Sequence, residues 1–109
     1  MKRWDWDREK LWEELEYNQA EIGELLAVFK ASSQQLLADI KRALEAGALT
    51  EAREKAHALK GACGTIYFRE GARLALGLEQ APDLDTAKKI FSSLYKLVGE
   101  FNKELDRFI

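Results

Sequence analysis

The amino-acid sequence predicts an all-α fold: an antiparallel four-helix bundle preceded by a short additional N-terminal helix. Apolar residues recur at helical spacing over nearly the whole chain, and no segment alternates with a period of two residues. Ala, Leu, Glu and Lys, which are good helix formers, dominate the composition, and a single proline leaves long segments uninterrupted. Because the predicted connections are short, successive long helices should pack antiparallel within a single domain covering residues 1–109.

Two helices are predicted in the first half of the chain, over residues 7–18 and 21–45. The apolar face of the first consists of Leu11, Trp12 and Leu15. The apolar face of the second consists of Ile22, Leu25, Leu26, Phe29, Leu36, Leu37, Ile40 and Leu44. Gly47 stands where a helix C-terminal stop is expected. We expect Trp4, Trp6 and Trp12 to cover one end of the bundle.

Three further helices are predicted in the second half. Thr50 is a plausible N-cap for the third, with Glu51 in its first turn. Its core positions are Ala52, Ala56, Leu59, Cys63 and Ile66. A fourth helix covers residues 69–80 and ends before Pro82, and either Asp83 or Asp85 caps the fifth. The apolar face of the fifth helix consists of Ala87, Ile90, Phe91, Leu94, Leu97, Val98, Phe101, Leu105 and Phe108.

Charge and composition exclude several classes of function. The formal net charge is −2 and the charges are interspersed without a basic stripe, so nucleic acid is not an expected ligand. The single cysteine, Cys63, cannot form an internal disulfide, which fits a reducing compartment. No signal peptide is visible, and no apolar run approaches the roughly 20 residues that span a bilayer. We expect a monomer without direct membrane contact, located in the cytoplasm or forming the cytoplasmic module of something larger.

The third predicted helix separates its only histidine from its core positions. At about 100° per residue, with Ala56 at zero, the other core positions cluster near 280–340°. His57 falls near 100°, with Arg53, Lys60, Gly61 and Gly64 on the same side at about 60°, 40°, 140° and 80°. A lone histidine is more often structural than functional, but this outward position favours a functional role.

Two glycines beside His57 are costly in a helix, at roughly 1 kcal/mol each relative to alanine. Their simplest use is to remove side chains around the imidazole, so that another protein can come close to Gly61 and Gly64. An exposed neutral imidazole is a competent nucleophile near neutral pH. Lys60, three residues on, could compensate charge on a phosphoryl group. Arg53 is a further candidate cation, although a solvated surface position is the preferred interpretation.

The segment His57-Ala58-Leu59-Lys60-Gly61-Ala62-Cys63-Gly64 closely resembles the signature of the histidine-containing phosphotransfer (HPt) domain, His-x-Leu-Lys-Gly-(Ser/Ala)-x-(Gly/x). The resemblance is strong over residues 22–81 and covers the last helix in shape only. It implies that His57 accepts a phosphoryl group from a receiver-domain aspartate and passes it to another receiver. Lys60 and Gly61 match the lysine and glycine of the family.

The resemblance also implies the partners and cofactors. Response-regulator receiver domains would be the partners, in a phosphorelay or within a hybrid sensor histidine kinase. The chain would be a phosphoryl carrier and not an enzyme: it needs no metal or cofactor of its own, since the Mg²⁺ for transfer belongs to the receiver. The family usually has a glycine where this chain has Tyr67, so either Gly71 takes over part of the following turn or the helix runs on.

Two other functions remain open at this stage. The segment 64–68 looks somewhat like the phosphoacceptor domain of a chemotaxis-type histidine kinase, which is phosphorylated from ATP by a separate kinase domain. A non-catalytic helical adaptor is the other alternative, against which the intact His57 and Lys60 argue. The donor of the phosphoryl group distinguishes the first alternative from a relay.

Overall fold

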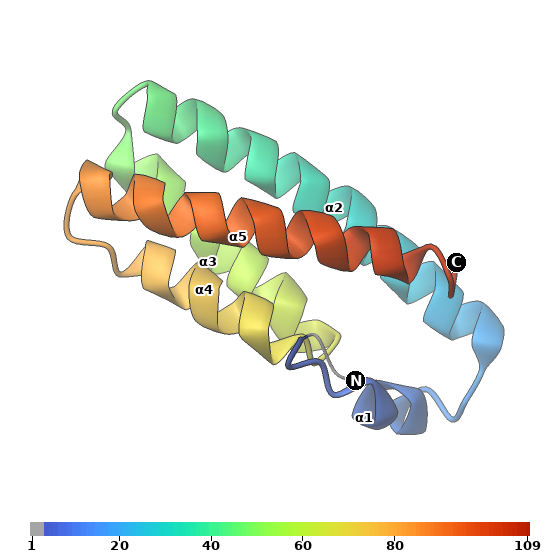
Figure 1. The fold of residues 1–109 in the computed structure, drawn as a ribbon. Helices are drawn as coiled ribbons and strands as arrows, with labels where there is room; N and C mark the ends of the chain where they lie inside the picture. Colours follow the sequence, from blue (N-terminus) through green and yellow to red (C-terminus); the bar gives the residue numbers. More distant parts are fainter. Residues whose placement is uncertain (1–3) are drawn as a thin grey trace.

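The computed structural model describes residues 4–109 and confirms the all-helical prediction (Figure 1). Its elements are α1 (Arg8–Glu14), α2 (Gln19–Glu45), α3 (Leu49–Thr65), α4 (Arg69–Glu79) and α5 (Leu84–Leu105). Within this part of the chain, the one pairing of β type is an isolated bridge between Trp6 and Phe68. Helices α2 and α4 each pack against α3 and α5. Figure 1 shows consecutive long helices running in opposite directions along the molecule.

The core forms because each long helix turns its apolar face inward. Burying a large apolar side chain stabilises a protein by roughly 1.5–3 kcal/mol. All five predicted core positions of α3 are buried, as are most of the predicted apolar positions of α2 and α5. Beside the turn between α3 and α4, the rings of Phe68 and Phe101 stack with their centroids 3.7 Å apart. No helix among residues 4–109 combines the length and the apolar character needed to cross a membrane.

Polar side chains cap three of the helices. Asp7, Asn18 and Asp83 each accept a hydrogen bond from a backbone N–H three residues further on, which satisfies a donor that the helix itself leaves free. Of the two predicted caps of α5, Asp83 is therefore the one used. Gly47, at φ 72°, ends α2 as predicted.

The first two helices differ from their predicted bounds. Helix α1 ends at Glu14 and not at Asn18, because Glu16 and Tyr17 adopt φ values of 53° and 59° that no right-handed helix allows. Backbone hydrogen bonds from both residues close the last turn. Asn18 is thereby free to cap α2, which begins at Gln19, two residues earlier than predicted.

The predicted N-cap of α3 is wrong. The cap position is Ala48, which makes no side-chain hydrogen bond, and Thr50 lies inside the first turn. The physical reason is packing: Ala48 and Leu49 lie against the core, and the tight turn at Gly47 starts the helix before Thr50 is reached.

The turn between α3 and α4 forms with Tyr67 at the position where the family usually has glycine. Helix α3 does not run on, because Tyr67 itself adopts φ 63° and its N–H binds the carbonyl of Gly64, while Phe68 N–H binds that of Cys63. This is the left-handed turn that usually takes glycine. Gly71 takes no part in it: a Cβ there would come within 2.7 Å of the Phe68 ring and 2.8 Å of Cys63 Sγ. Gly71 is therefore kept for close packing.

The tryptophan-bearing segment before α1 clamps this same turn. Trp6 is buried, and its indole Nε1 donates a 2.9 Å hydrogen bond to the carbonyl of Ile66. Its ring makes edge contacts with Trp12 and Phe101, and Trp4 makes another with Phe101. The tryptophans thus cover the end of the bundle where α3 turns into α4, as the sequence predicts.

Candidate functional site

His57 lies on the outward face of α3. Its side chain is 66% exposed, whereas Ala56, Leu59 and Cys63 on the opposite face are fully buried. The angular separation predicted from the helical repeat is therefore present in the folded chain. The imidazole can be reached from solvent without any movement of the core.

Glu79, at the end of α4, contacts the imidazole directly. Its Oε2 lies 2.8 Å from His57 Nδ1, and its Oε1 lies 2.8 Å from Lys60 Nζ. The Glu79 carboxylate therefore connects the Lys60 ammonium to the His57 imidazole. The packing of α3 against α4 places the C-terminal end of α4 beside the middle of α3. Sequence reasoning missed this carboxylate, which lies 22 residues from His57 along the chain.

The environment of Glu79 keeps its carboxyl ionised. The hydrogen bond from Lys60 lowers the pKa of Glu79, the hydrogen bond with His57 lowers it further, and partial burial opposes both. Oε1 is shielded from solvent and faces the lysine ammonium. Near neutral pH the group is therefore a carboxylate, which can accept hydrogen bonds but cannot donate them.

A carboxylate beside Nδ1 determines which ring nitrogen carries the proton. In the neutral imidazole one nitrogen donates and the other holds a lone pair, and a partner that only accepts selects the tautomer with its proton on Nδ1. The lone pair then lies on Nε2, which makes no hydrogen bond within residues 4–109. His57 thus presents a nucleophilic nitrogen to solvent.

Arg53 is exposed but anchored. Its Nε donates a 2.7 Å hydrogen bond to the backbone carbonyl of Glu79, where the negative end of the α4 dipole favours a cation. Arg53 therefore occupies the exposed surface position that the sequence favours, and the contact holds its guanidinium beside the end of α4. A shallow depression of about 390 Å³ beside the imidazole is lined by Thr50, Arg53, Glu54, His57 and Glu79.

The surface next to His57 along α3 is open. Gly61 and Gly64 are both exposed, and a Cβ built on either would have no neighbouring atom within 4 Å. Neither glycine is therefore required by packing inside the chain. Their role in leaving room for an approaching partner stays a prediction.

Cys63 belongs to the core and not to the site. It is fully buried, and burial raises the pKa of its thiol to about 12. Because the thiolate is the reactive form, this cysteine is inert near neutral pH.

The site is thus a solvent-exposed histidine that contacts a carboxylate on the outer face of a helical bundle. A family model for the Hpt domain matches residues 24–108, most of the chain. No curated protein and no solved structure matches the chain. The chain belongs to the Hpt domain family, whose members act in histidine phosphotransfer during two-component signalling.

Proposed function

We propose that this chain is a phosphorelay intermediate in which His57 accepts a phosphoryl group from a receiver-domain aspartate and passes it to a second receiver. The observation that carries the proposal is the contact between Glu79 and Nδ1, because it leaves the exposed Nε2 as the nucleophile. The chain acts as a carrier, and the Mg²⁺ and catalytic groups belong to the receiver.

The transfer step follows from this geometry. The Nε2 lone pair attacks phosphorus, the N–P bond forms, and the O–P bond of the aspartyl phosphate breaks to release the aspartate carboxylate. The proton on Nδ1 stays in place, so the ring becomes a phospho-imidazolium. Its positive charge lies 2.8 Å from the Glu79 carboxylate, which stabilises it. The reverse sequence returns the phosphoryl group to the next receiver.

The experiment that tests this proposal incubates the chain with a panel of phosphorylated receiver domains and follows acid-labile phosphate on the chain. A parallel reaction supplies ATP and a histidine-kinase catalytic domain of the chemotaxis type. Labelling from at least one receiver, with return of the label to a second, is the expected result. Labelling from the kinase alone would assign the chain to the ATP-dependent class, and labelling from neither donor would leave only the adaptor function.

Lys60→Ala should slow transfer without eliminating it. The lysine compensates charge at the site but forms no covalent bond, and losing one charge-assisted contact is worth roughly 1–3 kcal/mol. The transfer rate should fall about 5- to 150-fold. Lys55→Ala is the matched control on the same helix, because Lys55 faces Asp39 and not the site. Equal rates for the two variants would remove Lys60 from the site.

Glu79→Ala should lower the transfer rate by about 10- to 150-fold, which corresponds to a charge-assisted hydrogen bond of roughly 1.5–3 kcal/mol. Glu79 is a positioning residue, so a second measurement is needed. The ¹⁵N spectrum of the His57 ring should change from a single Nδ1–H tautomer to a mixture of tautomers. Glu79→Gln, which keeps an accepting oxygen, should restore the tautomer but only part of the rate. An unchanged ¹⁵N spectrum in Glu79→Ala would contradict this role.

Gly64→Gln should raise stability and lower transfer. The new side chain meets no neighbour, and replacing a helical glycine gains up to about 1 kcal/mol. The same side chain obstructs a receiver that approaches His57. Gly99→Gln on α5 is the matched control, because it is equally open but lies outside this surface. It should stabilise the chain and leave transfer unchanged. A destabilised Gly64→Gln variant, or a stable one with normal transfer, would place the docking surface elsewhere.

A further inference from the structure

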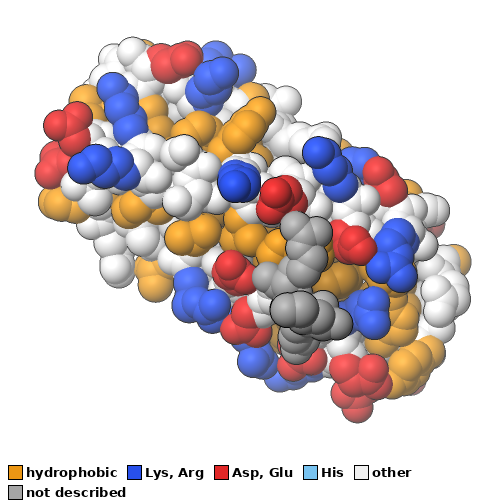
Figure 2. Space-filling view, viewed as in Figure 1, with side chains coloured by type: hydrophobic (Ala, Val, Ile, Leu, Met, Phe, Trp, Pro, Cys, Tyr) orange, Lys and Arg blue, Asp and Glu red, His pale blue; other side chains and the backbone are white. Residues whose placement is uncertain are grey.

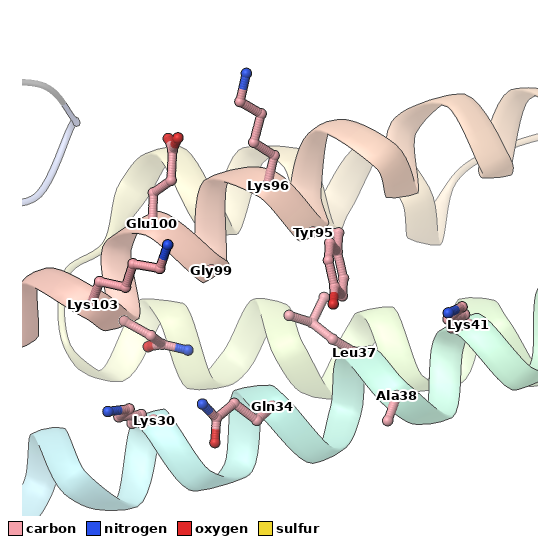
Figure 3. Close-up of a pocket in the computed structure, with 11 residues that line it drawn as sticks. Lys30, Gln34, Leu37, Ala38, Lys41, Tyr95, Lys96, Gly99, Glu100 and Lys103 are labelled. Atoms are coloured by element: carbon pink, nitrogen blue, oxygen red, sulfur yellow. The ribbon is translucent and has the colours of Figure 1, made fainter.

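A second concave surface lies between α2 and α5 and shares no residue with the His57 site. It is a groove of about 830 Å³, and all eleven residues that line it come from these two helices (Figure 3). The lysines of the wall are Lys30, Lys41, Lys96 and Lys103. Figure 3 shows Lys30 and Lys103 at one end of the groove and Lys41 toward the other.

The charge of this groove is opposite to that of the whole chain. Four lysines face a single glutamate among the lining residues, although the chain carries a net charge of −2. Lys30 is paired with Asp106 at 2.5 Å. For Lys41, Lys96 and Lys103, the described part of the chain supplies no ion pair. Three exposed cations around one groove produce a positive potential that attracts an acidic partner.

Between the lysines the groove is apolar and open. Tyr95 is 56% exposed and extends from α5 toward Leu37 of α2, and Gly99 leaves a gap in the α5 wall (Figure 3). A Cβ at Gly99 would meet nothing within 4 Å, so the chain itself does not require a glycine there. Figure 2 shows apolar side chains exposed on this face among basic ones. A helical segment could therefore approach α5 closely at this point.

The groove also contains a polar group without a partner. Asn102 is 3% exposed and its Nδ2 donates to Ser33 Oγ, but its Oδ1 has no hydrogen-bond partner within residues 4–109. An unpaired buried carbonyl is unfavourable. A donor from a molecule seated in the groove would give this oxygen a partner after a small side-chain rotation.

We propose that this groove binds an acidic amphipathic helix of a partner protein. From Lys30 to Lys41 the groove follows about three turns of α2, or about 16 Å. Glutamates or aspartates along both edges of such a helix would face the lysine walls, and its small apolar residues would contact Leu37, Tyr95 and Gly99. This is the helix-in-groove mode of recognition, with charge complementarity added to select the partner. The site would let the chain hold one partner while His57 remains free for a receiver.

The test uses the full chain and a fluorescein-labelled, helix-forming peptide about as long as the groove. The peptide carries glutamates along both edges and leucine and alanine along one face, and a second peptide has glutamine at every glutamate position. Fluorescence anisotropy should show saturable binding of the acidic peptide, weakening as salt is added, and much weaker binding of the neutral peptide. Equal binding of both peptides would overturn the proposal.

Substitutions in and outside the groove test whether the acidic peptide binds there. The double variant Lys41→Glu/Lys103→Glu should weaken binding at least about tenfold, because it sets like charges against the peptide. Lys88→Glu on α5, outside the groove, should change it less than about twofold. Gly99→Gln should weaken binding, whereas Gly64→Gln should not. If the groove variants bind the peptide like the unmodified chain, the proposal fails.

Binding of either of two other molecules in the groove would also overturn the proposal of an acidic helix. Binding of inorganic tripolyphosphate but not of the acidic peptide would make the groove a site for small anions. Concentration-dependent dimers in light scattering that Lys41→Glu/Lys103→Glu abolishes would make the occupant a second copy of the chain. Phosphoryl acceptance at His57 should remain unchanged in all groove variants, so failure of this proposal and failure of the phosphorelay proposal are distinguishable.

Discussion

His57→Gln should abolish acid-labile phosphorylation of the chain from every donor. A glutamine amide has no nucleophilic lone pair to replace that of Nε2, so the loss should be complete. Stability should change by no more than about 0.5 kcal/mol, since the replaced side chain is polar and exposed. Phosphate release in acid and thermal unfolding, measured on the same preparation, test both parts.

A second variant tests whether an exposed histidine on α3 is by itself sufficient for phosphorylation. Ala58 is also exposed on α3, but it lies about 100° further around the helix axis than His57. The double variant His57→Gln/Ala58→His should therefore remain unlabelled, because its imidazole is turned away from Glu79. Persistent labelling of His57→Gln itself would mean that another residue is the acceptor.

Trp6→Ala should cost about 3–5 kcal/mol of unfolding free energy, a large part of the 5–15 kcal/mol typical of a domain. The change empties a buried site between aromatic rings and leaves the carbonyl of Ile66 without its indole donor. It should also loosen the turn between α3 and α4. Urea unfolding followed by circular dichroism measures the effect.

The control for this prediction is Trp6→Phe, which keeps an aromatic ring but removes the donor. It should cost roughly 1–3 kcal/mol, the usual cost of a buried unpaired acceptor. A loss below about 1 kcal/mol for Trp6→Ala would mean that the N-terminal segment is a loosely attached extension. Because Trp6 precedes residue 24, where the family match begins, this clamp is a feature of this chain beyond the matched domain.

Much of the fold and half of the site could be predicted from local rules. The helical repeat separates Ala56, Leu59 and Cys63 from His57 by a simple rotation about one axis, and the structure shows that separation. Gly47 ended α2 as predicted because a left-handed residue at a helix end is a local requirement. Such features depend only on neighbouring residues, so a single sequence is enough to find them.

The errors arose where packing overrode local preference. Thr50 is a better N-cap than Ala48 by propensity, but burial of Leu49 beside the core starts α3 earlier. Tyr67 occupies a left-handed turn that glycine would adopt at lower cost. The Tyr67 hydroxyl donates a hydrogen bond to Glu14, and the Tyr67 carbonyl accepts one from the N–H of Asp7 in the N-terminal segment. Local preferences of about 1–2 kcal/mol yield to tertiary contacts that together are worth more.

By itself, the sequence determined that this chain is helical, that His57 lies on an outward face, and that its motif is that of a phosphotransfer domain. Only the tertiary structure decided that Glu79 holds Nδ1, that Arg53 is anchored to the end of α4, and that lysines from α2 and α5 line one groove. The physical reason is distance along the chain. Helical periodicity relates residues within a few turns, whereas contacts between helices depend on how all the apolar faces pack together.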